Sequence, residues 1–406
     1  MLDLTKLYTQ IAALGRYQIG RRNEIANALE VAENLVKNAS ENIEVFKNKI
    51  ERLDNSGISW LVAIPTGEDP FTAHPRLDCP KSYTVLSTDG SQIGPDRHAA
   101  HQAFLINIGK VKLSYGEFLS YKLDSEPTLF FEEKEVIRPF GGEERAVSGS
   151  LLAALRQKME AEALADMINE YAERPAVALV DGTLILWNLE ASPEHLHELD
   201  TADLKQQSFI SFMQLLSISR QENLPVAGYI SATGSSDVIN ALKVYMCPIE
   251  PTNCKGKYCQ INDIGFDGES PCANINAVTD AELFGRLLKD GERSSLFKSR
   301  SEILKAYGDE SIYFFYLKVG TEIARIEVPG WVAHDSKAVG LVHCICLDQA
   351  EKGMGYPIAV AEAHEQAVVK AADREIFNQL VSRELIRQGT PVLESRKAVL
   401  KKGGLI

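Results

Sequence analysis

Two short apolar runs in this sequence end in the same acidic turn, and this repetition constrains the fold more than any other feature. Residues 83–91 end in Asp-Gly-Ser and residues 176–183 end in Asp-Gly-Thr, so the two carboxylates are Asp89 and Asp181. Apolar and β-branched runs bounded by glycine and serine are typical of buried strands that end in a turn. Asp-Gly is also common in ordinary turns, so either motif alone is weak. Their repetition predicts two core strands that each present an aspartate at their end, and such a pair can hold a divalent metal ion.

The composition excludes several classes of protein. With 406 residues, of which 45% are hydrophobic, the chain can build one large elaborated domain or two to three smaller ones. A net charge of -13 argues against a protein that coats nucleic acid through bulk electrostatics, so any DNA contact must be local. The N-terminus lacks a signal-peptide pattern and no apolar run is long enough to span a bilayer, so we expect a cytoplasmic protein without a membrane partner.

The first segment, residues 1–80, is predicted to be a helical arm followed by a loop-rich connector. Its apolar residues recur at steps of three and four, which is the pattern of a heptad seam: Ile25, Leu29, Ala32, Val36, Ala39, Ile43, Phe46, Ile50 and Leu53. Such a seam packs either along the body of its own chain or against a second copy, and the second arrangement would make a homodimer. Prolines interrupt residues 57–80, which form the connector.

The next segment, residues 81–385, is predicted to be an α/β core with a mixed sheet and flanking helices. Besides the two runs described above, apolar stretches indicate strands at 103–109, 111–115, 225–231, 312–319, 323–329 and 342–347. Amphipathic patterns indicate helices at 148–173, 204–220, 235–244, 280–288, 301–307 and from Pro357 onward. The final segment, residues 386–406, is a basic tail.

A loop-like stretch within this core, residues 246–275, holds four of the seven cysteines: Cys247, Cys254, Cys259 and Cys272. Four thiolates on such a stretch can close a tetrahedral zinc site or hold an iron–sulfur cluster, because the metal supplies the ordering energy that a loop lacks. Unrelated reduced cysteines are the alternative. The odd total favours a reducing compartment over a disulfide framework.

Four pieces of the core, taken in order, resemble the NurA family of nucleases, which in prokaryotes work with the HerA helicase-translocase in resecting DNA ends. They are the strand that ends in Asp89-Gly90-Ser91, the helix with Arg156 and Glu160 that leads to Asp181-Gly182-Thr183, the strand at Gly228–Ser231, and the segment from Gly355-Tyr356 to His364-Glu365. Their order and approximate spacing agree over roughly residues 80 to 385, and the agreement of four pieces in order is fairly specific.

The resemblance implies an RNase H-like core with a manganese-dependent active site. It assigns metal binding to Asp89, Glu160, Asp181 and His364. It also implies a role for Tyr356, whose hydroxyl would orient the phosphate or a water molecule. Glu162 lies on the same predicted helix as Glu160 and is the alternative ligand.

Elementary chemistry favours the same function. Cleavage of a phosphodiester requires neutralisation of the charge on the phosphoryl oxygens and a lower pKa of the attacking water, and one or two divalent ions held by carboxylates provide both. Carboxylate ligands suit magnesium or manganese, and a histidine ligand favours manganese. This chemistry predicts a metal-dependent nuclease that uses manganese or magnesium. The resemblance to the NurA family further implies that it processes DNA ends in double-strand break repair together with a HerA-type translocase.

Two other functions fit parts of the sequence. Repeated strand-Asp-Gly turns also resemble the phosphate loops of actin-like ATPases and sugar kinases, but those loops usually place a residue between Asp and Gly, and no convincing adenosine-binding glycine motif is present. The other function is non-catalytic: a dimeric adaptor that uses the heptad helix and a cysteine-bound metal to clamp onto a DNA translocase.

Overall fold

The computed structural model describes residues 3–55, 60–67, 69–95, 103–140, 143–171, 173–187, 203–248, 250 and 271–389. The chain forms two compact units, and each unit is assembled from separate segments. Unit 1 comprises Met1–Leu77, Ile230–Glu302 and Ser311–Glu327, and unit 2 comprises Asp78–Tyr229, Ile303–Glu310 and Val328–Ile406. In the described part of the chain, none of the helices has the length and apolar character needed to cross a bilayer.

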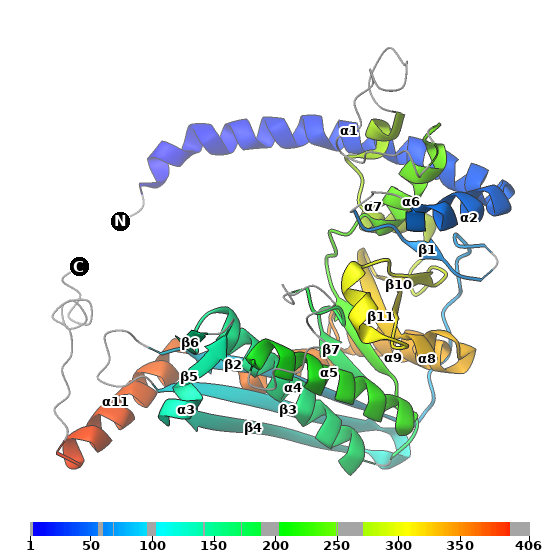
Figure 1. The fold of residues 1–406 in the computed structure, drawn as a ribbon. Helices are drawn as coiled ribbons and strands as arrows, with labels where there is room; N and C mark the ends of the chain where they lie inside the picture. Colours follow the sequence, from blue (N-terminus) through cyan, green and yellow to red (C-terminus); the bar gives the residue numbers. More distant parts are fainter. Residues whose placement is uncertain are drawn as a thin grey trace. The chain divides into compact units, whose positions relative to one another are not determined.

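Unit 2 is built on a mixed sheet with the strand order β8-β7-β2-β3-β4 (Figure 1). The strands are β2 (Tyr83–Ile93), β3 (Phe104–Tyr115), β4 (Ser120–Phe130), β7 (Ala176–Asp181) and β8 (Val226–Ile230). The pairs β2-β7 and β7-β8 are parallel, whereas β2-β3 and β3-β4 are antiparallel. A separate hairpin joins β5 (Ile137–Phe140) and β6 (Glu143–Ala146). The predicted mixed α/β architecture is confirmed.

Two strands of this sheet differ from the sequence prediction. β3 is one continuous strand, in place of the two predicted runs at 103–109 and 111–115. The Gly-Lys pair between those runs does not break it, because β3 pairs with β2 on one side and with β4 on the other along almost its whole length. β4 has no counterpart among the predicted strands, because nearly all of its residues are exposed and its sequence shows no buried face.

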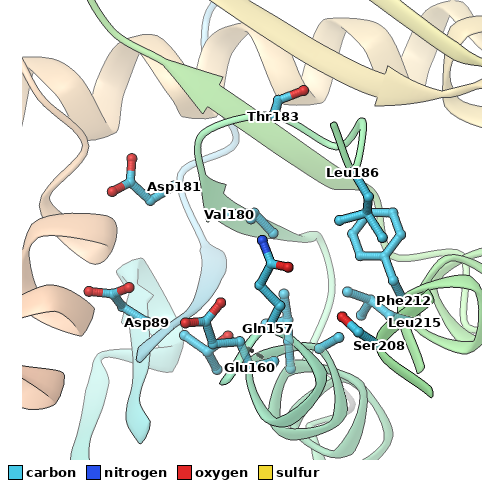
Figure 2. A pocket seen from close by; sticks show the side chains of 13 residues that line it. Asp89, Gln157, Glu160, Val180, Asp181, Thr183, Leu186, Ser208, Phe212 and Leu215 are labelled. Carbon is cyan, nitrogen blue, oxygen red and sulfur yellow. Dashed lines mark hydrogen bonds between the residues drawn. The ribbon is translucent and has the colours of Figure 1, made fainter. Parts of the chain in front are cut away.

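Helices cover both faces of this sheet. α4 (Ser150–Glu170) packs on one face with α5 (Leu204–Gln221) beside it, and α10 (Ile358–Ala367) packs on the other face against β2 and β3. The predicted helices at 148–173 and 204–220 are thereby confirmed. Behind α4 lies a core of apolar side chains from β3 and α4: Phe104, Ile106, Ile108, Leu151, Leu152 and Leu155. The end of β7 lies beside β2 and α4, at the place drawn in Figure 2.

The remaining helices of unit 2 are α3 (Glu133–Val136), α8 (Gly330–Ala333), α9 (Ser336–Lys352) and α11 (Ala371–Arg387). The strand predicted at 342–347 is wrong, because these residues lie in the middle of α9. All six of them are buried in the helix. In a short run that is buried throughout, His343 included, the sequence has no periodicity that separates a buried helix from a buried strand.

Unit 1 has its own strands and core. Its strands are neighbours in the order β1-β9-β10-β11. They are β1 (Ile64–Pro65), β9 (Phe297–Lys298), β10 (Ile312–Val319) and β11 (Glu322–Pro329). The last two confirm the strands predicted at 312–319 and 323–329. The helices of this unit are α1 (Tyr8–Glu41), α2 (Ile43–Glu51), α6 (Asp237–Met246) and α7 (Asp280–Leu287).

The heptad seam packs against its own chain. Most of its apolar residues from Leu29 to Leu53 are buried in the core of unit 1, together with residues of α6 and α7. The seam therefore forms a helical arm on the body of the chain, which is one of the two predicted arrangements. The first half of α1, ahead of the buried seam, has exposed apolar side chains: Tyr8, Ile11, Leu14, Tyr17 and Ile19.

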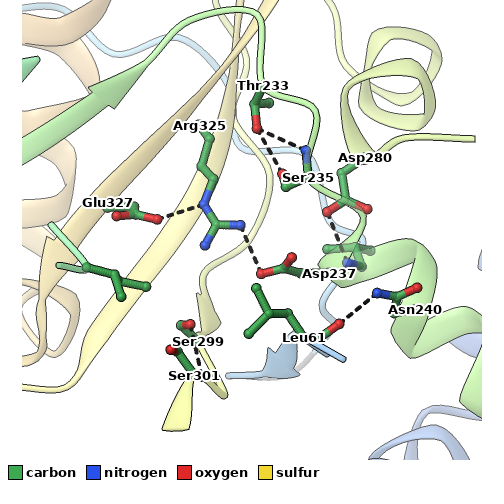
Figure 3. Close-up of polar contacts among 12 residues, drawn as sticks. Leu61, Thr233, Ser235, Asp237, Asn240, Asp280, Ser299, Ser301, Arg325 and Glu327 are labelled. Atoms are coloured by element: carbon green, nitrogen blue, oxygen red, sulfur yellow. Dashed lines mark hydrogen bonds and ion pairs between the residues drawn. The ribbon is translucent and has the colours of Figure 1, made fainter. Parts of the chain in front are cut away.

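A buried ionic network ties the elements of unit 1 together (Figure 3). The guanidinium of Arg325 donates hydrogen bonds to Asp237 at 3.0 Å and to Glu327 at 2.9 Å. Asp280 accepts hydrogen bonds from two backbone amides in the first turn of α6 and from the hydroxyl of Tyr316. Burial raises the pKa of Asp280 to about 7, and the carboxylate of Asp237 adds to this rise. The network thus links β10 and β11 to the beginnings of α6 and α7.

Candidate active site

Asp89 lies within β2, at the point where one of its two neighbours in the sheet ends. The parallel pairing of β2 with β7 stops at Thr88 and Val180, whereas the antiparallel pairing with β3 continues through Asp89 to Ile93. The prediction that the first strand ends at Asp89 is therefore wrong, because β3 extends the strand beyond the acidic residue. The carboxylate still lies at an edge, namely the edge left by the end of β7.

Asp181 is the last residue of β7, as the sequence predicts. Gly182 follows it with a φ of +92°, a conformation that glycine adopts without steric cost. The amide of Gly182 donates a hydrogen bond of 2.9 Å to the carbonyl oxygen of Tyr229 on β8, which fixes the turn. Since Thr88 and Val180 are partners in parallel strands, the next residue of each strand places its carboxylate at the same edge of the sheet.

Glu160 reaches this edge from the helix α4. Its carboxylate lies 3.5 Å from Nε of Arg156, one turn earlier on the same helix. The guanidinium of Arg156 also donates a hydrogen bond of 2.9 Å to the carbonyl oxygen of Gly90. Thr88 donates a further hydrogen bond to the carbonyl oxygen of Glu160. These contacts attach the middle of α4 to β2 beside Asp89.

The environment of Glu160 opposes its ionisation. Burial raises the pKa of this carboxyl to about 8; the guanidinium of Arg156 opposes the rise, and the carboxylates of Asp89 and Asp181 add to it. Oε1 of Glu160 is buried, and it is the oxygen that lies 3.5 Å from Nε of Arg156. The ion pair with Arg156 therefore offsets only part of the cost of ionising this buried carboxyl.

His364 and Tyr356 each contact one of the two aspartates. Nδ1 of His364, on α10, lies 2.8 Å from Oδ2 of Asp89. The hydroxyl of Tyr356 donates a hydrogen bond of 2.6 Å to Oδ1 of Asp181. The ring of Tyr356 packs edge to face on Tyr229, with 5.6 Å between the centroids. Burial raises the pKa of Tyr356, and the hydrogen bond to Asp181 adds to the rise, so this hydroxyl is a hydrogen-bond donor at neutral pH.

The structure thus brings the five predicted residues together in unit 2. Asp89, Glu160 and Asp181 line one pocket and surround the same opening in Figure 2. Among the described residues, no group of three or more Asp, Glu, His or Cys side chains lies close enough together to coordinate one metal ion. The side chains are arranged in pairs instead, His364 with Asp89 and Tyr356 with Asp181. Each pair gives one carboxylate a hydrogen-bond partner, which offsets part of the repulsion between the acids.

A comparison with known families decides the identity of this core. The family model described as the NurA domain matches residues 83–369. The chain belongs to the NurA family. The match spans the strand with Asp89, the helix with Glu160, the end of β7 and the helix with His364, so it includes all five predicted site residues.

Solved structures of NurA proteins are similar to this chain at low sequence identity. The NurA nuclease from Sulfolobus solfataricus is 14% identical, with a TM-score of 0.48, and the match covers 88% of this chain and 98% of that one. A NurA structure with bound dAMP and manganese is 12% identical, with a TM-score of 0.34, and the match covers 86% of this chain and 95% of that one. None of the curated proteins matches the chain.

Three glycines of this NurA core have a role that sequence reasoning missed. A Cβ atom on Gly109 of β3 would lie 2.3 Å from the carbonyl oxygen of Ala363 on α10, the helix with His364. A Cβ atom on Gly228 of β8 would lie 2.5 Å from the carbonyl oxygen of Gly182, in the turn after Asp181. A Cβ atom on Gly90 of β2 would lie 2.5 Å from Oε1 in the side chain of Glu160. Each glycine leaves space for the element that carries one site residue. The sequence around a glycine does not reveal which element packs against it, so this role could not be predicted.

The two candidate glutamates of α4 face different neighbours. Glu160 faces Asp89 and Asp181, whereas Glu162 accepts hydrogen bonds from Lys158 and from Ser211 of α5. The geometry therefore favours Glu160 over Glu162 as the member of the site.

Half of the predicted cysteine site lies outside the described residues. Cys254 and Cys259 fall in the segment 251–270. Cys247 is buried at the end of α6 and Cys272 is partly exposed. A zinc site or iron–sulfur cluster on the four cysteines stays a prediction.

Proposed function

We propose that this NurA family protein is a metal-dependent DNA nuclease whose site consists of Asp89, Glu160, Asp181, Tyr356 and His364. The observation that supports this proposal is the meeting of three carboxylates, from β2, β7 and α4, at the rim of one pocket. Carboxylate side chains from separate elements are expensive to gather without a cation, because their charges repel. A function that uses a divalent ion accounts for this arrangement.

The residues present fit manganese or magnesium. Asp89, Glu160 and Asp181 would supply oxygen ligands and His364 a nitrogen ligand, and the nitrogen favours manganese. Three carboxylates that line one pocket, with the imidazole of His364 beside Asp89, are a donor set that such an ion takes. When bound, the ion would neutralise charge on the phosphodiester and lower the pKa of the attacking water.

The protein's own groups position the ligands. The hydrogen bond from Tyr356 holds the carboxylate of Asp181, and the same hydroxyl lies where it would orient a phosphate oxygen or a water molecule. The contact with Asp89 fixes the ring of His364. Arg156 holds α4 against β2 through the carbonyl oxygen of Gly90, which keeps Glu160 beside Asp89.

We also propose that the core is RNase H-like. Its support is the order of the elements: three antiparallel strands β2, β3 and β4 come first, and α4, β7, α5 and β8 follow, with β7 and β8 parallel to β2. In this topology the carboxylate from β2 and the carboxylate from the end of β7 belong to one site.

A cleavage assay tests the nuclease proposal. We expect the purified protein to degrade end-labelled DNA in the presence of manganese, and to lose this activity in a chelator and in the Asp89→Asn and Asp181→Asn variants. Asp166→Asn, at an exposed position of α4, is the matched control and should retain activity. Equal cleavage by the wild type and both site variants would show that the proposed site is wrong. Tight binding of ATP would favour a kinase-like function instead.

Family membership supports a further proposal about partners. We propose that the protein acts with a HerA-type translocase on DNA ends, and that it is a homodimer, for which the exposed apolar side chains of α1 provide a surface. Sedimentation of the purified chain tests the dimer. Co-purification with a HerA-type translocase tests the partner, and failure to bind any such translocase would contradict it.

A further inference from the structure

Two cysteine side chains that are far apart in the chain meet in unit 2. Cys79 lies four residues ahead of Tyr83, the first residue of β2, and Cys344 lies on α9. The two thiols interact directly, and each changes the ionisation of the other. Neither cysteine belongs to the four clustered cysteines or to the five site residues, so the proposed nuclease reaction does not use them.

The contact between these thiols is part of a longer contact between the start of β2 and α9. The hydroxyl of Tyr83 donates a hydrogen bond to Asp348. Nζ of Lys352 lies 5.8 Å from the centroid of the Tyr83 ring. Cys344, Asp348 and Lys352 follow one another at intervals of four residues, so they lie on one face of α9. The segment 79–83 therefore lies along this face, and its contacts keep the two thiols together.

The two thiols differ in exposure and in acidity. Cys79 is partly exposed, whereas Cys344 is only 3% exposed. The hydrogen bond between the two thiols lowers the pKa of Cys344, and the same hydrogen bond, together with burial, raises the pKa of Cys79. A lowered pKa increases the fraction of thiolate, which is the form that attacks another sulfur. An oxidant can therefore reach Cys79, and Cys344 is placed to react with the oxidised sulfur.

We propose that Cys79 and Cys344 form a reversible disulfide bond when a peroxide oxidises the protein. The sulfur of Cys79 attacks one oxygen of hydrogen peroxide, the O–O bond breaks, and a sulfenic acid forms as one water molecule leaves. The sulfur of Cys344 then attacks the sulfenic sulfur, and the S–S bond forms as a second water molecule leaves. The two thiols lose two electrons and two protons in all, and the peroxide takes them. A dithiol reverses the reaction by exchange at the exposed sulfur and is itself oxidised.

The disulfide would fasten α9 to the segment with which unit 2 begins. β2 carries Asp89, and α9 leads through the turn with Tyr356 to α10, so the bond joins elements that hold opposite sides of the candidate site. A cross-link between distant positions restricts the unfolded chain much more than the folded one, in which these thiols are already in contact. The oxidised protein should therefore unfold at a higher temperature. The inference does not depend on the proposed nuclease function.

Peptide mapping tests the cysteine pair. The full-length protein is treated with hydrogen peroxide, its remaining thiols are blocked, and it is digested with trypsin without reductant. We expect the peptide 77–81, which contains Cys79, to be joined to the peptide 338–352, which contains Cys344, and to separate from it in a dithiol. The second peptide also contains Cys346, so Cys346→Ala should still form the link and Cys344→Ser should not. A link that persists in Cys344→Ser, or oxidation of Cys79 without any link, would overturn the proposal.

Thermal unfolding provides a second test. Peroxide should raise the midpoint of the wild type by several degrees, and a dithiol should reverse the rise. Cys79→Ser changes a partly exposed residue, so the variant should fold and should lose this response. Cys346→Ala, which removes a neighbouring buried thiol, is the matched control and should keep the response. No rise in the wild type, or an equal rise in Cys79→Ser, would overturn the proposal.

Discussion

A Cβ atom on Gly90 of β2 would lie 2.5 Å from Oε1 of Glu160 on α4. Non-bonded atoms do not approach so closely, and the same Cβ would also lie 2.8 Å from Cγ of Arg156. The absence of a side chain at residue 90 therefore leaves the space on β2 that the side chains of Glu160 and Arg156 occupy. Asp89 is the neighbour of Gly90 in the strand, so the contact that admits α4 also places Glu160 beside Asp89.

We expect Gly90→Ala to weaken manganese binding because the added methyl group displaces Glu160 from Asp89. It should also destabilise the fold by about 1–3 kcal/mol, the usual cost of overpacking. Calorimetric titration with manganese and chemical denaturation measure the two effects. Gly94→Ala is the matched control, since its Cβ would meet only Cδ2 of Leu152, at an ordinary 3.6 Å. Equal manganese affinities in the two variants would contradict this account.

Tyr356→Phe removes only the hydroxyl that donates to Asp181 and keeps the ring that packs on Tyr229. Loss of a hydrogen bond to a metal ligand typically lowers metal affinity or activity about 10- to 100-fold, and we expect a loss in this range with an unchanged midpoint of thermal unfolding. Tyr121→Phe, at an exposed position of β4, should leave both quantities unchanged. A Tyr356→Phe enzyme with wild-type activity would remove this tyrosine from the site.

Manganese binding should release a proton at neutral pH. The pKa of Glu160 in the metal-free protein is about 8, well above the ordinary value of 4.5, so the carboxyl is mostly protonated at about pH 7 and must lose its proton to bind the ion. The apparent affinity for manganese should therefore rise with pH and level off above about pH 8. Calorimetry in buffers with different ionisation enthalpies measures the released protons, and Glu160→Gln should release none from this position.

Arg156 should set the pH at which this proton is lost. Its positive charge lowers the pKa of Glu160, so Arg156→Ala should raise that pKa and move the pH profile of manganese affinity to higher pH. A merely structural role for Arg156 would lower stability without moving the profile. Arg156→Lys keeps the charge but not the planar group, and its profile should lie closer to that of the wild type.

The ionic network of unit 1 yields a stability prediction. Arg325→Met would leave Asp237 and Glu327 buried without their cation, and breaking such a buried pair typically costs about 3–5 kcal/mol. Chemical denaturation measures this cost. Arg286→Met, which removes a more exposed ion pair with Glu33 in the same unit, is the control and should cost about 1 kcal/mol or less. Similar costs in both variants would contradict a structural role for the network.

Local patterns were sufficient for much of the fold. The strand with Asp181, the helices with Glu160 and His364, and the strands at 312–319 and 323–329 each have a period or a boundary that the sequence displays directly. These elements also carry three of the five site residues, namely Glu160, Asp181 and His364. The correct prediction of their positions follows from short-range rules for strands, caps and turns.

The errors have a common physical origin in tertiary contacts. β2 continues past Asp89 because β3 pairs with it, and β4 forms because β3 offers an edge, although β4 itself is mostly exposed. The choice between Glu160 and Glu162 depends on which side of α4 faces β2. The pocket beside the carboxylates depends on the space that α4 and α5 leave between them, and no single segment contains that information.

The contact between His364 and Asp89 joins two residues that are 275 positions apart in the chain. The strand β2 emerges from the ribosome long before α10, so a nascent chain carries the first acid of the site without the last ligand. Activity can begin only after the sheet has formed and α10 has packed onto Gly109. Incomplete or truncated chains would therefore lack the proposed nuclease activity.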